Sequence, residues 1–205
     1  MEVVKVIKLS KSIGIKNILN NVTLILHRGE RLNIYGREGS GKTILIKCLL
    51  DLVIRDGGSI SIFGYDPLNY REEILKQVGY IPQNVYIRTR LNLGDILDVI
   101  HNLYEERYGL LEELGLIGYI DEDVRKLNYE HIIRLYTYIA LAKEPKLIII
   151  DDIETKIDGK SLYLIRRYID RNNITLITTS RNPSNVLGEY IHALLDGGGL
   201  HQYPG

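Results

Sequence analysis

The segment GREGSGKT, residues 36–43, constrains the fold of this chain more than any other part of its sequence. It matches the pattern GxxxxGK[ST], in which glycines let backbone amides close around phosphate oxygens without a Cβ in the way. The helix that follows such a loop directs the positive end of its dipole at the same anion. The motif needs a strand before it and a helix after it, and RLNIY (31–35) and ILIKCLLDLV (44–53) have the spacing of those elements.

Each residue of this phosphate-binding loop (P-loop) has an expected role toward a bound nucleotide. Lys42 is expected to neutralise the β and γ phosphates, and the Thr43 hydroxyl is the expected ligand of Mg²⁺. The other loop residues are expected to surround the phosphates; they are Gly36, Arg37, Glu38, Gly39, Ser40 and Gly41. The alternative is a chance glycine-rich turn, and the flanking strand and helix argue against it.

A second acidic site is needed to hold magnesium beside a P-loop. The run LIII (147–150) is apolar on both faces, as a central parallel strand should be, and two aspartates follow it directly. Asp151 is the expected carboxylate on the magnesium side. Asp152 stands where such ATPases place the base that orients the attacking water. The alternative is that both acids only cap a strand or the next helix. The presence of a P-loop argues against this alternative.

The remaining pattern predicts an α/β protein in which a helical block interrupts a sheet. From about Asn92 to Lys143, apolar residues recur at helical spacing, and strands and helices alternate again afterwards. Two shorter helices are expected at 69–77 and 162–169. The other expected strands are VKVIKL (4–9), the stretch 22–26, SISIF (59–63), VGYI (78–81) and ITLITT (174–179).

Charge and composition argue against several kinds of partner and site. The 26 basic and 26 acidic residues cancel, so no overall field draws the chain to nucleic acid or to an anionic membrane. A single cysteine, Cys48, cannot form an internal disulfide, which fits a reduced, cytosolic setting. The most apolar long stretch, 43–54, is broken by Lys47 and Asp51 and is too short to span a bilayer. We therefore expect no nucleic-acid binding and no direct membrane insertion.

Taken together, these motifs resemble the ATPase subunits of ABC transporters, and the resemblance covers nearly the whole chain. VGYIPQ (78–83) resembles the Q-loop and puts Gln83 where a glutamine contacts magnesium or the lytic water. ETKID (154–158) resembles the D-loop, and 190–203 resembles the last hairpin of the family. Residues at the spacing of the signature helix and the Walker B strand are Leu127, Arg134, Ala140, Leu141, Pro145, Asp151 and Asp152.

The resemblance implies a P-loop NTPase fold with a RecA-like core, an N-terminal antiparallel β subdomain and an inserted helical subdomain. It implies one domain over 1–205, with the core at 1–83 and 144–205 and the helical subdomain at about 84–143. It also implies ATP and Mg²⁺ as cofactors and catalytic roles for Lys42 and Gln83. A transmembrane subunit would be the partner, so the chain would be cytoplasmic and peripheral to the membrane through it.

The sequence departs from the family pattern at the segment that caps a partner subunit's ATP. The family's LSGGQ is here Leu127-Asn128-Tyr129-Glu130-His131. Tyr129 adds bulk, and Glu130 brings a negative charge toward an anion, so close approach is disfavoured sterically and electrostatically. We expect this chain to cap a partner's nucleotide poorly.

Three further departures concern the chain's own site. Asp152 replaces the usual glutamate, which retracts the carboxylate by one methylene, on the order of 1.5 Å. Ser180 stands in the place of the switch histidine, and its hydroxyl is short for reaching a γ-phosphate. Ile13 stands where the family usually has an aromatic residue that stacks on adenine, so apolar packing is possible but stacking is not. Slow or negligible hydrolysis is expected.

The sequence thus leads to a ranked set of hypotheses. The first is the ATP-binding subunit of an ABC transporter with impaired hydrolysis, which pairs with a better-preserved ATPase subunit because a homodimer would have two poor sites. The second is a regulatory or interaction module of the same ATPase family that works without a membrane partner. An active P-loop kinase or other NTPase is disfavoured, because no acceptor-binding segment is apparent.

Overall fold

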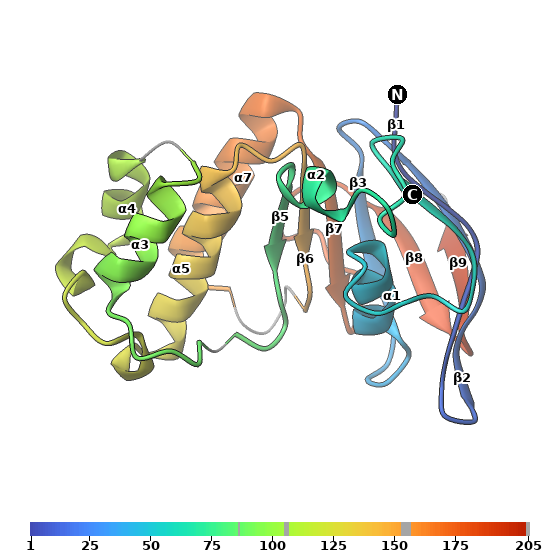
Figure 1. Ribbon diagram of the computed structural model, residues 1–205. Helices are drawn as coiled ribbons and strands as arrows, with labels where there is room; N and C mark the ends of the chain where they lie inside the picture. The colour runs from blue at the N-terminus through green and yellow to red at the C-terminus, as the bar shows by residue number, and fades with distance from the viewer. Residues whose placement is uncertain (86, 105–106, 153–156, 204–205) are drawn as a thin grey trace.

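The computed structural model describes residues 1–85, 87–104, 107–152 and 157–203, which form two β-sheets flanked by helices (Figure 1). The smaller sheet is antiparallel, with strand order β2-β1-β4. Its strands are β1 (Glu2–Ile13), β2 (Lys16–His27) and β4 (Gly57–Ile62). The alternating segments near the N-terminus therefore form the antiparallel part that the sequence predicts.

The larger sheet has six strands in the order β5-β6-β7-β3-β8-β9. The first five run parallel to their neighbours, and the last pairs antiparallel with β8. All residues of β6 and β7 are buried, which explains the apolar run at 147–150. The strands are β3 (Arg31–Tyr35), β5 (Val78–Ile81), β6 (Leu147–Ile150), β7 (Thr175–Ser180), β8 (Ile191–Asp196) and β9 (Gly199–Tyr203).

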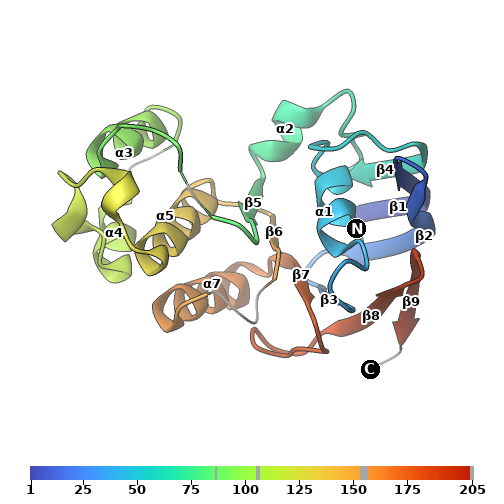
Figure 2. The ribbon, with the colours of Figure 1, turned by 90° about the horizontal axis from the view of Figure 1, so that it is seen from below.

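Helix α1 (Lys42–Leu49) lies between the two sheets, as the view from below shows (Figure 2). Leu45, Ile46 and Leu49 are fully buried in a core that contains side chains from both sheets. This packing removes apolar surface from water on two sides of a short helix. The N-terminal end of α1 therefore has a fixed position relative to β3.

The helix ends sooner than its apolar spacing over 44–53 indicates. Asp51 takes a left-handed conformation, with φ of 51°. The N–H of Leu52 donates to the carbonyl oxygen of Lys47 at 2.8 Å, and the N–H of Asp51 donates to that of Cys48 at 3.2 Å. These two bonds form the Schellman motif that closes a helix, and hydrophobic periodicity alone does not reveal it.

The helical block lies between β5 and β6 in the chain and to one side of the sheets (Figure 1). It comprises α3 (Leu93–His101), α4 (Tyr108–Leu114) and α5 (Tyr129–Ala142), with 3-10 turns at Ile117–Tyr119 and Val124–Lys126. Its apolar faces share a second core with β6, β7 and α7 (Gly159–Asn172). A further short helix is α2 (Arg71–Leu75). The α/β architecture with an inserted helical block agrees with the sequence prediction.

Among the described residues, no helix is both long and apolar enough to cross a bilayer.

Replacing Leu49 by alanine tests the importance of α1 packing for stability. Leu49 is fully buried, so Leu49→Ala should lower the free energy of unfolding by about 2–5 kcal/mol in chemical denaturation. The control is Leu103→Ala, because Leu103 is 70% exposed and should change that free energy by less than about 0.5 kcal/mol. Equal effects of the two substitutions would contradict the buried position of α1.

Candidate nucleotide-binding site

Four neighbouring parallel strands end at the same edge of the larger sheet, and each is followed by a predicted site residue. The P-loop follows β3, Gln83 follows β5, the two aspartates follow β6, and Ser180 ends β7. Ligands of open α/β sheets bind at the carboxyl ends of the strands. A cavity of about 230 Å³ at this edge is lined by Ile18, Glu38, Gly39, Ser40, Gly41, Lys42, Thr43, Ile44, Gln83, Asp151, Asp152, Thr179 and Arg181.

The Lys42 ammonium group holds the P-loop together from within. Its Nζ donates to the carbonyl oxygen of Gly36 at 2.6 Å and to that of Arg37 at 3.0 Å, and lies 3.5 Å from the Ser40 hydroxyl. Partial burial lowers the pKa of Lys42, while the charges of Asp152 and Asp151 act in the opposite direction. A cation with this environment is suited to bind an anion in the loop.

Gly41 is required where the loop enters α1. Its φ is 106°, a conformation that side chains rarely adopt, and a Cβ there would lie 3.0 Å from Cγ2 of Ile18. Ile18 comes from β2 and lines the cavity. Sequence analysis missed Ile18, because nothing in its local pattern links the hairpin of the smaller sheet to the P-loop.

Three oxygen-bearing side chains meet at the magnesium position that the sequence predicts. The Thr43 hydroxyl lies 3.5 Å from Oε1 of Gln83. Asp151 is buried; its Oδ1 accepts a hydrogen bond of 2.5 Å from the Thr179 hydroxyl. Its Oδ2 is buried without a hydrogen-bond partner among the residues the structure describes. An unpartnered carboxylate oxygen on a residue that lines the same cavity as this hydroxyl and amide oxygen fits a hard divalent cation.

Asp152 faces the same cavity in a left-handed conformation. Its φ is 63°, which aspartate tolerates better than most residues. Its carboxylate accepts a hydrogen bond of 3.0 Å from Nε2 of Gln83, and its backbone N–H donates to the Thr179 hydroxyl at 2.7 Å. The structure thus brings Gln83, Asp151 and Asp152 together with Lys42 and Thr43.

Ser180, in contrast, directs its hydroxyl into the protein. The hydroxyl accepts a hydrogen bond from the Asn33 amide at 3.0 Å and donates to the carbonyl oxygen of Asn182 at 2.6 Å. Asn33 also donates to the Thr178 hydroxyl at 2.9 Å, and both asparagine and serine side chains are buried. Ser180 therefore serves a buried polar network, whereas the next residue, Arg181, lines the cavity.

Ile13 lies away from the other predicted site residues. It is 54% exposed, pairs with Lys16 at the turn between β1 and β2, and does not line the cavity. Its assignment to the base of a nucleotide stays a prediction.

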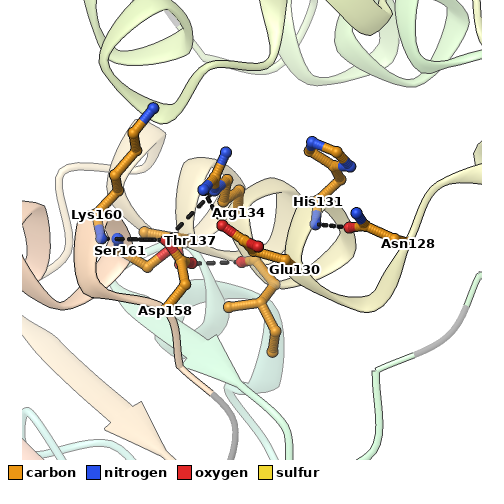
Figure 3. Close-up of polar contacts among 9 residues, drawn as sticks. Asn128, Glu130, His131, Arg134, Thr137, Asp158, Lys160 and Ser161 are labelled. Carbon is orange, nitrogen blue, oxygen red and sulfur yellow. Dashed lines mark hydrogen bonds and ion pairs between the residues drawn. The ribbon is translucent and has the colours of Figure 1, made fainter.

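The segment that replaces the family signature forms the start of α5 (Figure 3). The Asn128 side chain caps the helix by accepting from the N–H of His131 at 2.9 Å. Glu130 forms an ion pair with Arg134, whose Nε also lies 3.3 Å from Asp158. The charge of Glu130 is thus partly compensated by Arg134, which the sequence argument did not foresee.

Two other features of this region bear on the sequence predictions. Tyr129 is 43% exposed at the first position of α5, so its bulk is at the surface. Asp158 caps α7 by accepting from the backbone N–H groups of Lys160 and Ser161. The rest of the predicted D-loop, residues 154–156, lies outside the described residues.

Comparison with known proteins adds independent information about the family. A model of the ABC transporter family matches residues 19–155 of this chain. The uncharacterized ABC transporter ATP-binding protein YdbJ of Bacillus subtilis (strain 168) is 29% identical over 166 residues, which are 78% of this chain and 54% of that protein. The energy-coupling factor transporter ATP-binding protein EcfA1 of Fusobacterium nucleatum is 28% identical over 198 residues, 90% of this chain and 75% of EcfA1. The chain thus spans about half the length of YdbJ.

Solved structures with a similar fold include the ATP-binding subunit of an ABC transporter, with a TM-score of 0.84 and 22% identity over 97% of this chain and 88% of the other. The ADP conformation of MJ1267, an ATP-binding cassette of an ABC transporter, has a TM-score of 0.76 at 17% identity, over 98% of this chain and 89% of that one. These likenesses confirm the P-loop NTPase fold. Because the family match covers more than half of the chain, including the P-loop, Gln83 and both aspartates, the chain belongs to the ABC transporter family and carries its ATP-binding domain.

Proposed function

We propose that this chain binds Mg-ATP as the nucleotide-binding subunit of an ABC transporter and hydrolyses it slowly. The observation that carries the proposal is the cavity at the strand ends, where Lys42, Thr43, Gln83 and Asp151 converge. Its volume of about 230 Å³ is below the roughly 300–1,000 Å³ of pockets that enclose a whole ligand. The cavity therefore takes the phosphates, and the base extends toward the hairpin of β1 and β2, where Ile18 and Ile13 provide apolar surface.

Lys42 and the P-loop amides bind the phosphates in this proposal. The ammonium group exchanges its bonds to the carbonyl oxygens of Gly36 and Arg37 for bonds to phosphate oxygens. Thr43, Gln83 and Asp151 would hold Mg²⁺ through their oxygens, and the magnesium would neutralise part of the negative charge on the phosphates.

Slow hydrolysis is supported by the surroundings of the two residues at the catalytic positions. The Asp152 carboxylate is one methylene shorter than glutamate and is tied to the Gln83 amide at 3.0 Å. The Ser180 hydroxyl is committed to Asn33 and Asn182 and is buried. A base must lie within hydrogen-bond reach of the water that it activates, so both features disfavour rapid turnover.

The quaternary part of the proposal concerns two partners. ABC ATPase subunits work with transmembrane partners, and the present chain has a groove of about 760 Å³ for such a contact. The groove follows the Q-loop, and its lining combines apolar side chains with three arginines: Val85, Ile87, Leu127 and Ile132 with Arg88, Arg90 and Arg125. A second, better-preserved ATPase subunit is favoured over a homodimer, because Tyr129 still adds bulk where a partner's nucleotide would be capped.

Removal of the Lys42 charge tests nucleotide binding. The wild type should bind ATP in a magnesium-dependent way in isothermal titration calorimetry. Lys42→Ala should weaken binding by about 10- to 100-fold, the range expected for lost charge-assisted hydrogen bonds. Lys5→Ala, at an exposed ion pair with Glu2, is the control and should bind as the wild type does. Absence of magnesium-dependent binding by the wild type would refute the proposal.

Extending the carboxylate at position 152 tests the cause of slow hydrolysis. Asp152→Glu should raise the steady-state rate of phosphate release several-fold, because the added methylene advances the carboxylate by on the order of 1.5 Å toward the water. Asp152→Asn, which cannot act as a base, should not raise the rate. Wild-type turnover near the roughly 10 s⁻¹ of an average enzyme would show that Asp152 is an adequate base as it stands.

A charge placed in the groove tests the membrane partner. Ile87→Asp should reduce the fraction of the chain that sediments with membranes of its source cells, because a carboxylate that loses its hydration would replace an apolar side chain that is buried in the contact. The matched control is Val99→Asp on α3, where the wild-type valine is 57% exposed and lies outside the groove. If the wild type binds ATP but does not sediment with membranes, a regulatory module without a membrane partner becomes the better interpretation.

A further inference from the structure

An arginine, Arg181, directly follows Ser180 at the end of β7 and lines the cavity. The Ser180 side chain is 1% exposed and is held by Asn33 and Asn182, so it has no access to the cavity. The carbonyl oxygen of Ser180 accepts a hydrogen bond of 3.3 Å from the N–H of Gly36, which joins the end of β7 to the start of the P-loop. These bonds fix the backbone from which the Arg181 side chain extends.

Arg181 lines the cavity together with three acidic residues, Glu38, Asp151 and Asp152. Its guanidinium forms an ion pair of 3.2 Å with Glu38, itself a residue of the P-loop. The side chain of Arg181 is 59% exposed and that of Glu38 is 84% exposed, so solvent screens their attraction and the ion pair is weak. The guanidinium can therefore exchange Glu38 for a stronger anion at small cost.

The order of the strands indicates which part of a nucleotide Arg181 would meet. Strand β7 lies between β3, which leads to the P-loop, and β6, which leads to Asp151 and Asp152. Arg181 follows β7 directly, so it enters the cavity between the P-loop and the two aspartates. Arginine binds phosphate oxygens in a bidentate manner, which a serine hydroxyl cannot do.

We propose that Arg181 moves from Glu38 to the terminal phosphate when a nucleoside triphosphate binds, and thereby makes this site prefer the triphosphate to the diphosphate. The inference rests on the proposed nucleotide-binding function and adds a residue that determines phosphate-chain specificity. Glu38 holds the guanidinium beside the P-loop and would compete with the phosphate for it.

The test compares dissociation constants for ATP and ADP, both with Mg²⁺, in isothermal titration calorimetry. Arg181→Ala should weaken ATP binding by about tenfold, the lower end for a charge-assisted hydrogen bond at a half-exposed site, and should leave ADP binding nearly unchanged. Arg181→Lys should restore part of the preference for ATP, because it keeps the charge but not the bidentate geometry. A structural role would weaken both nucleotides equally and would not be rescued by charge.

The control variant is Arg166→Ala. Arg166 lies on α7, is also 59% exposed and also pairs with a carboxylate, Asp170, but does not line the cavity. The Arg166→Ala variant should bind both nucleotides as the wild type does.

A second variant tests the competition by Glu38. Glu38→Gln should raise the ratio of ATP affinity to ADP affinity, and this increase should be absent in the double variant that also carries Arg181→Ala.

The same measurements distinguish failure of the Arg181 inference from failure of the proposed nucleotide-binding function. If the wild type binds ATP with Mg²⁺ but Arg181→Ala keeps the wild-type ratio of ATP to ADP affinity, Arg181 forms only a surface ion pair and this inference is overturned while the proposed function stands. If the wild type binds neither nucleotide, both are overturned.

Discussion

The packing of α1 between the two sheets is the constraint on which the site depends, because the P-loop is the short segment that joins β3 to this helix. Strand β3 is held in the larger sheet by parallel neighbours on both sides, and α1 buries Leu45, Ile46 and Leu49 against both sheets. With both ends fixed, the loop has little freedom to open. Its backbone amides and the helix N-terminus are therefore preorganised around the place where phosphates bind.

The same edge of the sheet carries two hydrogen-bonded networks with opposite consequences for function. The Thr179 hydroxyl donates to the Asp151 carboxylate and accepts from the backbone N–H of Asp152, which fixes the Asp151 side chain and the Asp152 backbone beside the cavity. The network around Asn33 draws Ser180 away from the cavity instead. Under the proposed function, such a site would keep the groups that bind phosphate and magnesium and would weaken those that activate water.

Much of the fold and the centre of the site could be predicted from the sequence, because they depend on local patterns. The P-loop motif, the apolar strand before Asp151 and the alternation of the early strands each report a single element and its neighbours in the chain. Contacts between distant elements could not be predicted in this way. Ile18 reaches the loop from the smaller sheet, and Arg134 contacts Asp158 at the start of α7. The ion pair of Arg134 with Glu130, in contrast, joins residues four apart on one helix and could have been inferred from the sequence. The early end of α1 depends on a left-handed Asp51, which hydrophobic spacing does not encode.

The central claim is that nucleotide binding and nucleotide turnover are separated in this chain. The most direct test measures magnesium-dependent ATP binding and steady-state phosphate release on one preparation of the wild-type chain. The account predicts saturable binding that requires Mg²⁺, together with phosphate release far slower than the roughly 10 s⁻¹ typical of enzymes. Rapid phosphate release, or ATP binding that is indifferent to Mg²⁺, would contradict it.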